Sequence, residues 1–117
     1  MTKKLRITLE TPDGCNTMMV SGIYDKKAQK IKYLEEDKTK VIIDIMNKEL
    51  IRENNNIYLK YLFNLEKNTD NIVKIKELNK NIQLLIKTNK FNNNDKLLEI
   101  EYEIIDSNDK FSYKIEY

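Results

Sequence analysis

The chain has 117 residues, of which 40% are hydrophobic and 34% charged, and its 21 basic and 19 acidic residues leave a net charge of +2. It contains no histidine and one cysteine, Cys15. These counts exclude histidine-dependent nucleophile pairs, internal disulfides and two-thiolate zinc sites. We therefore expect one domain over residues 1–117, with no catalytic residue, metal or cofactor.

Charge and hydropathy patterning also bear on location and partners. Lys3 and Lys4 are followed by no long apolar stretch, and no apolar run approaches the roughly 18 residues of a membrane span. Lysines alternate with acidic residues, as in 96–101, which is typical of a solvated surface and disfavours a strongly electrostatic partner. We expect a protein of the reducing cytoplasm without membrane association.

Apolar residues alternate along most of the chain, and short polar turns separate the alternating segments. The first strand is followed by a turn at Pro12-Asp13-Gly14, and the Asn-rich segments 54–56 and 92–95 are expected to be turns as well. Strands of this length, repeated along the chain, predict an antiparallel sandwich or barrel. The expected strands comprise residues 5–9, about 17–24, a segment from 31, 41–45, 50–53, 57–65, 98–104 and 111–117.

Residues 72–88 fit two structures. Ile72, Ile75, Leu78 and Ile82 could form the apolar stripe of a helix. The alternative is a hairpin of 72–78 and 82–88 around Asn79-Lys80-Asn81. The two central asparagines have poor helix propensity, which favours the hairpin without excluding the helix.

Residues spaced along the chain resemble a known family. The shared pattern is roughly G-x-Y, Y-x-E-E, T-x-x-I and I-x-R, and it resembles the YwiB-like family of small bacterial proteins of unknown function over about residues 4–117. The residues that match are Gly22-Ile23-Tyr24, Tyr33-Leu34-Glu35-Glu36, Thr39 with Ile42-Ile43, Ile51-Arg52, Leu59, Phe63, the segment from Leu84 to Thr88, and Ile100-Glu101-Tyr102.

This resemblance implies an all-β fold, an antiparallel up-and-down lipocalin-like barrel of about eight to ten strands. By the same resemblance, residues 72–88 form a hairpin. Where the family tends to have glycine after I-x-R-x, this chain has Asn54, which tolerates the left-handed conformation of a turn. The family brings no established activity with it.

Two charged residues fall on apolar faces by strand parity. Glu35 follows Ile31 and Tyr33 on one alternating face, and Arg52 shares its face with Leu50. Because an isolated charge inside a barrel is costly unless paired, we predict that Glu35 and Arg52 pair at or inside the barrel mouth and hold the polar end of a ligand. The alternative is that both reach water at strand ends or form a purely structural pair.

Aromatic residues also occupy the inferred inner faces. Core packing is the simpler interpretation, but buried tyrosine hydroxyls need partners, which favours a partly polar cavity over a dry core. The predicted ligand-binding residues are therefore Tyr33, Glu35, Arg52, Tyr61, Phe63, Tyr102 and Tyr113.

The sequence thus favours a non-catalytic barrel that binds a small amphipathic or apolar ligand in its interior. One alternative is a packed barrel that acts as a protein-interaction or self-association module, for example as a homodimer. Another is single-stranded nucleic-acid binding, with Tyr24 and Tyr58 as stacking residues near Lys26, Lys27 and Lys60. The small net charge disfavours nucleic acid.

Overall fold

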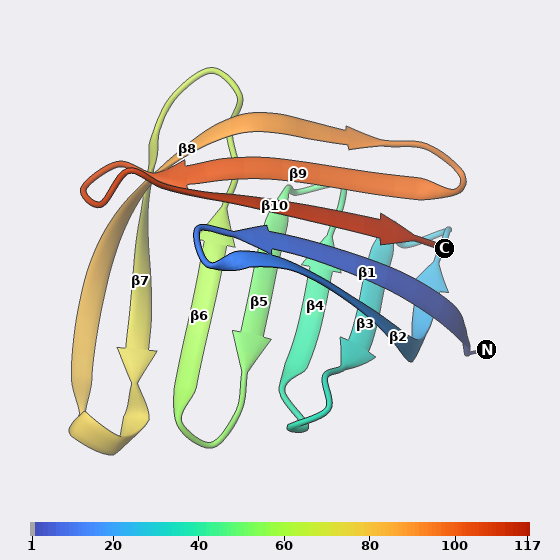
Figure 1. Cartoon of the computed structure of the whole chain (residues 1–117), viewed down its shortest axis with the longest axis horizontal. Helices are drawn as coiled ribbons and strands as arrows, with labels where there is room; N and C mark the ends of the chain where they lie inside the picture. Colours follow the sequence, from blue (N-terminus) through green and yellow to red (C-terminus); the bar gives the residue numbers. More distant parts are fainter. Residues whose placement is uncertain (1) are drawn as a thin grey trace.

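Strands occupy most of residues 2–117, the part of the chain that the computed structural model describes (Figure 1). Each strand pairs antiparallel with the next along the chain, and β1 pairs with β10 to close a ten-strand barrel. This confirms the predicted all-β, up-and-down barrel, whereas the lipocalin-like type stays a prediction. The elements are β1 (Lys3–Thr11), β2 (Gly14–Asp25), β3 (Lys30–Leu34), β4 (Lys40–Asp44), β5 (Glu49–Glu53), β6 (Ile57–Leu62), β7 (Thr69–Ile75), the 3-10 helix η1 (Lys76–Leu78), β8 (Lys80–Asn93), β9 (Leu97–Ile104) and β10 (Asp109–Glu116).

The core lies inside the barrel because alternate residues of each strand point inward. Ile43, Leu98 and Ile100 are fully buried there. The outer face carries the intervening charges, and Lys90 lies 3.3 Å from Glu99 and 3.8 Å from Glu101 through Nζ and carboxylate oxygens. Within residues 2–117, no helix combines the length and apolar character needed to cross a bilayer.

The expected strand 57–65 is too long, since β6 ends at Leu62. Phe63 still reaches the core, but Leu65 lies in the following loop and is 52% exposed. Asn64 causes this change of direction: its side-chain oxygen accepts the Glu66 N–H at 2.9 Å, which closes a turn.

The hairpin interpretation of residues 72–88 is confirmed, with β7 and β8 as its arms. Its turn lies at Lys76–Asn79, earlier than predicted, where Asn79 has a φ of 48°. β8 also continues to Asn93, past a bulge between Thr88 and Lys90. The bulge shifts the inward positions by one residue, so that Phe91 follows Thr88 in the interior.

Asn54 does not adopt the left-handed conformation that its place in the family pattern suggests. The non-glycine residues with a positive φ angle are instead Gln29, Lys38, Lys48, Asn79 and Asn108. It shapes the β5–β6 turn through its side chain instead. The Asn54 carboxamide oxygen accepts the N–H groups of Asn56 at 2.8 Å and Ile57 at 3.0 Å, and its amide donates to Thr39 Oγ1 at 3.0 Å.

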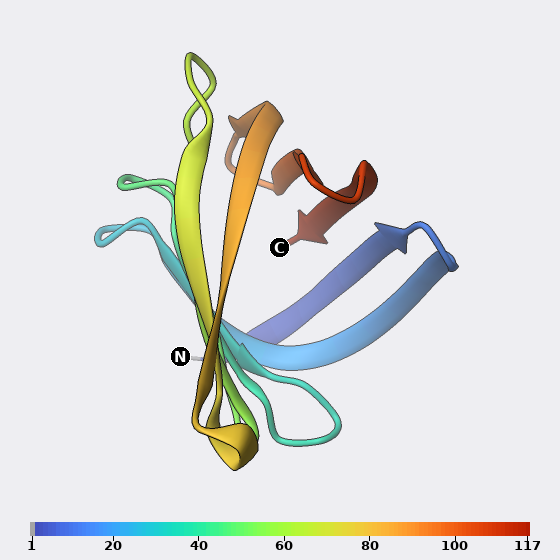
Figure 2. The same cartoon turned by 90° about the vertical axis from the view of Figure 1, so that its left-hand side faces the viewer.

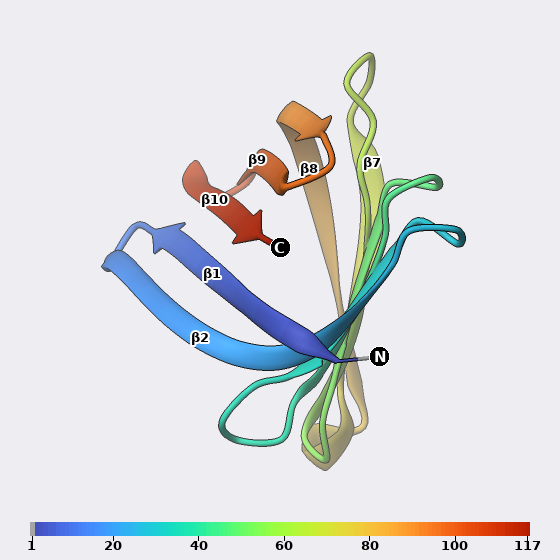
Figure 3. The same ribbon diagram turned by 90° about the vertical axis from the view of Figure 1, so that its right-hand side faces the viewer.

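Two strands change neighbours along their length. β2 pairs with β1 over Gly14–Gly22 but with β3 only over Gly22–Asp25. β8 pairs with β7 up to Ile86 and with β9 beyond it. Figures 2 and 3 show the result: β3–β7 form one wall, and the β1–β2 hairpin swings away from it.

Gly22 marks the position where β2 and β3 separate. A Cβ there would lie 2.6 Å from Leu5 Cδ1, 2.7 Å from the Lys32 carbonyl oxygen and 3.0 Å from Tyr33 Cβ. Only glycine allows such a close approach without displacement of backbone. The glycine of the G-x-Y pattern is therefore required by packing where β2 passes between β1 and β3.

Candidate functional site

Arg52 and Glu35 meet as the sequence predicts. Arg52 lies opposite Val41 on β4 and Leu59 on β6, both of which are buried, so it points to the barrel interior. Glu35 directly follows β3 and is anchored by its N–H to the Thr39 carbonyl oxygen at 2.9 Å. Arg52 Nη2 donates to Glu35 Oε1, and the side chains are 28% and 14% exposed respectively. The pairing is confirmed, while the role of these residues in holding a ligand stays a prediction.

The guanidinium of Arg52 is charged but incompletely bonded. Burial alone lowers the pKa of Arg52, but interactions with Tyr113 and the Glu35 carboxylate outweigh this effect and raise its pKa overall. Arg52 Nε is buried and has no hydrogen-bond partner among residues 2–117, and no other buried side-chain nitrogen or oxygen of this region shares that condition. The barrel therefore presents an unused donor on a permanently charged group.

Arg52 also lines a cavity of about 210 Å³ inside the barrel. Its lining mixes apolar side chains with Arg52 and tyrosines, since Leu50 lies opposite Tyr61 and Leu59 lies opposite Arg52 in the β5–β6 ladder. Its lining consists of Leu9, Thr11, Leu50, Arg52, Leu59, Tyr61, Tyr102, Phe111 and Tyr113. Four of the predicted site residues, Arg52, Tyr61, Tyr102 and Tyr113, thus share one cavity.

The three remaining predicted residues lie beside this cavity. Glu35 reaches it only through its pair with Arg52. Tyr33 occupies the same row of the sheet, two strands from Arg52, and is 5% exposed. Phe63 packs behind Tyr102, with ring centroids 5.4 Å apart, and belongs to the core.

Strand parity could indicate that Leu9, Leu50, Leu59 and Phe111 face inward, but it could not show that they border an open space. The sequence pattern did not indicate that Thr11 lines a cavity, because this residue ends its strand beside the turn. Alternation reports the direction of a side chain and not the volume left between side chains.

The cavity tyrosines are neutral hydrogen-bonding groups. Burial raises the pKa of Tyr113 to about 12, and it also raises the pKa values of Tyr61 and Tyr102. A neutral phenol both donates and accepts a hydrogen bond. Together with Arg52, these side chains make the cavity lining partly polar.

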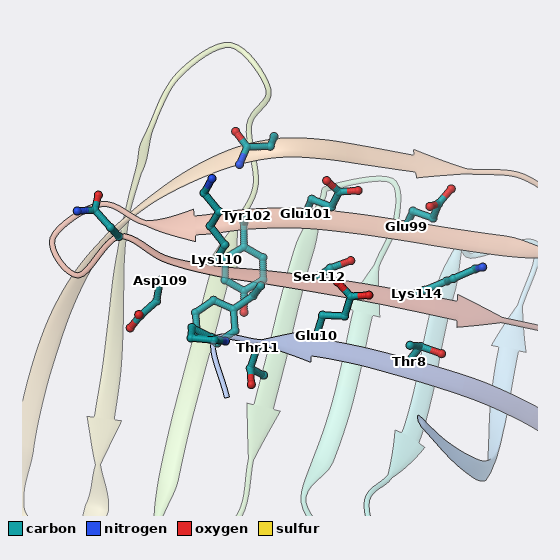
Figure 4. A pocket seen from close by; sticks show the side chains of 14 residues that line it. Thr8, Glu10, Thr11, Glu99, Glu101, Tyr102, Asp109, Lys110, Ser112 and Lys114 are labelled. Atoms are coloured by element: carbon teal, nitrogen blue, oxygen red, sulfur yellow. The ribbon is translucent and has the colours of Figure 1, made fainter. Parts of the chain in front are cut away.

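Two surface grooves adjoin the cavity. The larger, about 690 Å³, lies over β1, β9 and β10 and is flanked by opposite charges such as Glu10 and Lys114 (Figure 4). It shares Tyr102 and Phe111 with the inner cavity. The second, about 610 Å³, lies between β2 and the loop that begins at Glu35, and Arg52 lines both this groove and the cavity.

Tyr24, one of the two predicted stacking residues for nucleic acid, has an aromatic and a basic neighbour within the chain. The Tyr24 ring packs against Tyr117 with centroids 4.2 Å apart, and Lys3 Nζ lies 6.0 Å from its centroid. The aromatic face is therefore already in use. Within residues 2–117, no group of three or more Asp, Glu or Cys side chains is placed to hold a metal ion.

By its fold and cavity, the chain is a small antiparallel barrel of ten strands with a partly polar interior. Its structure is similar to the crystal structure of the YwiB protein from Bacillus subtilis, with a TM-score of 0.63 and 14% sequence identity over 97% of this chain and 87% of that one. The likeness concerns the fold, and at that level it confirms the predicted resemblance. No protein-family model matches the chain. No curated protein matches it either.

Proposed function

We propose that the barrel interior binds a small amphipathic molecule without altering it chemically. The cavity of about 210 Å³ supports a small ligand. At roughly 30 Å³ per water, it has room for about seven water-sized groups, less than the ~300 Å³ or more of pockets for drug-sized molecules.

The buried Nε of Arg52, without a partner among residues 2–117, is the observation that carries this proposal. A buried donor left without an acceptor costs about 1–3 kcal/mol, and a shift of the Arg52 side chain on binding would bring Nε to an oxygen of the bound molecule and remove that cost. Leu9, Leu50 and Leu59 offer an apolar surface within the same cavity. We infer a ligand with a carbonyl or carboxylate oxygen at one end and an apolar body.

Binding without reaction agrees with the chemistry of these side chains. A general acid or base works best when its pKa is near the ambient pH. Arg52 and Tyr113 have pKa values raised above their ordinary ones, so neither exchanges protons readily at neutral pH.

Native mass spectrometry of freshly purified protein tests this function. We expect a bound mass that is lost on denaturation, and we expect Arg52→Met to abolish it. In parallel, NMR can follow the cavity leucine methyl groups during titration with hexanoate, benzoate and their carboxamides. Tyr113→Phe, which removes one hydroxyl, should weaken binding of the best of these, whereas Tyr58→Phe on the outer wall should not.

A protein without bound mass, whose cavity methyl signals respond to none of the four compounds, would contradict the proposal. It would favour the packed-barrel alternative, in which the surface performs the function. Equal responses of wild-type protein and Arg52→Met would also contradict it, because the acceptor would then not be bound by the guanidinium.

A further inference from the structure

The first half of β2 is a strand edge without a neighbour. The ladder between β2 and β3 covers only Gly22–Asp25, so that Cys15–Ser21 has a paired strand on the β1 side alone. Within residues 2–117, no loop backbone forms hydrogen bonds with Cys15–Ser21. Figure 3 shows this part of β2 projecting from the wall of β3–β7.

This edge lacks the features that usually protect strand edges from pairing. Natural edges are short, charged, interrupted by proline or twisted by a bulge. Cys15–Ser21 has seven residues with the sequence Cys-Asn-Thr-Met-Met-Val-Ser, without charge or proline, in a chain of which 34% is charged. Its register with β1 is unbroken, and Met19 is 60% exposed.

The groove beside this edge has enough volume for part of one additional strand. A strand is about 4.8 Å wide in the sheet, sheets pack about 10 Å apart and each residue adds about 3.4 Å, so one residue needs roughly 160 Å³. The groove of about 610 Å³ therefore has room for about four residues, and it follows the five residues Asn16–Val20.

The side of the groove opposite β2 is acidic. Glu35, Glu36 and Asp37 line it, with Arg52 as the basic residue of the lining. Hydrogen bonds from the Thr39 hydroxyl and N–H lower the pKa of Asp37, which keeps this carboxylate ionised. An incoming strand thus meets an excess of negative charge.

We propose that the free edge of β2, residues Cys15–Ser21, binds an extended basic segment of a partner protein as an added β-strand. Backbone hydrogen bonds to the edge provide affinity, and the acidic residues Glu36 and Asp37 select Lys or Arg. A second copy of this chain fits less well, because its own free edge, Cys15–Ser21, carries no basic side chain to meet Glu36 and Asp37.

Selection from a display library of random octapeptides tests the proposal. The peptide with the greatest enrichment is synthesised, and amide hydrogen exchange of the full chain is measured with and without it. We expect enriched peptides to be rich in Lys and Arg, and exchange to slow specifically within Asn16–Val20. No enrichment, acidic peptides or protection at another part of the barrel would overturn it.

A charge reversal provides the matched test of specificity. Glu36→Lys should weaken peptide binding about fivefold, as expected for an exposed ion pair, while Glu66→Lys, an exposed glutamate in the β6–β7 loop, should leave it unchanged. Equal effects of the two variants would contradict recognition at the groove. Sedimentation of the peptide-free protein as a dimer with protected Asn16–Val20 amides would overturn the proposal in favour of self-association.

Discussion

Alkaline pH should destabilise the barrel through Tyr113, and substitution of this residue isolates the effect. Tyr113 is 5% exposed, and burial raises its pKa to about 12, with Arg52 opposing this shift and Glu35 adding to it. An unfolded tyrosine has a pKa of about 10. Between these values the folded protein retains a proton that the unfolded chain has released.

The sign and size of the effect follow from proton linkage. Because the folded state binds more protons in this window, the free energy of unfolding decreases as the pH rises. The contribution is fully present below about pH 10 and is lost as the pH rises through about 12. Two pKa units at about 1.4 kcal/mol each give a loss of about 3 kcal/mol from this residue alone once the pH is well above 12.

Urea unfolding followed by circular dichroism at pH 9, 10, 11 and 12 measures the effect. The stability of wild-type protein relative to Tyr113→Phe should fall by about 2 kcal/mol across that range, since the variant has lost the titrating group and the loss is incomplete at pH 12. Phe111→Leu, which changes the same cavity without removing an ionisable group, serves as control and should parallel the wild type. Parallel curves for wild type and Tyr113→Phe would refute the assignment of Tyr113 to a water-poor interior.

Three further substitutions test the packing and the polar contacts. Gly22→Ala should destabilise the fold by about 1–3 kcal/mol by urea unfolding, because its methyl group meets backbone, whereas Ser21→Ala on the exposed side should have little effect. Arg52→Met should lower the free energy of unfolding by about 2–3 kcal/mol, less than for a fully buried pair. Adding Glu35→Leu to this variant should restore part of the lost stability, whereas additive losses would contradict a coupled pair. Asn54→Ala should cost about 1–2 kcal/mol through the turn contacts that it removes, and an unchanged denaturation midpoint would show that these contacts are not stabilising.

Alternation along the chain predicted an antiparallel sandwich or barrel, the family resemblance selected the barrel, and strand parity then predicted the meeting of Glu35 with Arg52. Period-two patterning fixes which residues face inward, and short turns make consecutive strands neighbours. Tyr33, Val41 and Arg52 then occupy one row across β3, β4 and β5. Glu35, two residues after Tyr33, faces inward at the end of that row and within reach of the guanidinium.

Features that depend on register could not be predicted in the same way. The bulge between Thr88 and Lys90 changes the parity of β8 without a glycine or proline to mark it. Likewise, nothing in the alternation of β2 shows that its pairing with β3 ends at Gly22. A ladder stops where two backbones diverge, and this depends on the twist and curvature of the whole sheet.

The end of the β2–β3 ladder at Gly22 explains the free edge of β2 and the groove beside it. On the N-terminal side of Gly22, residues Cys15–Ser21 of β2 pair with β1 and not with β3. The barrel wall therefore has no strand that joins β2 to β3 along this stretch. Arg52 lies at this opening and lines the space on both sides, which accounts for a guanidinium that is half-buried, paired at one nitrogen and unpartnered within residues 2–117 at another. A barrel with β3 extended along Cys15–Ser21 would enclose Arg52 completely and cover the free edge. The incomplete β2–β3 ladder is therefore the structural origin of the free edge and of the groove that Arg52 shares with the inner cavity.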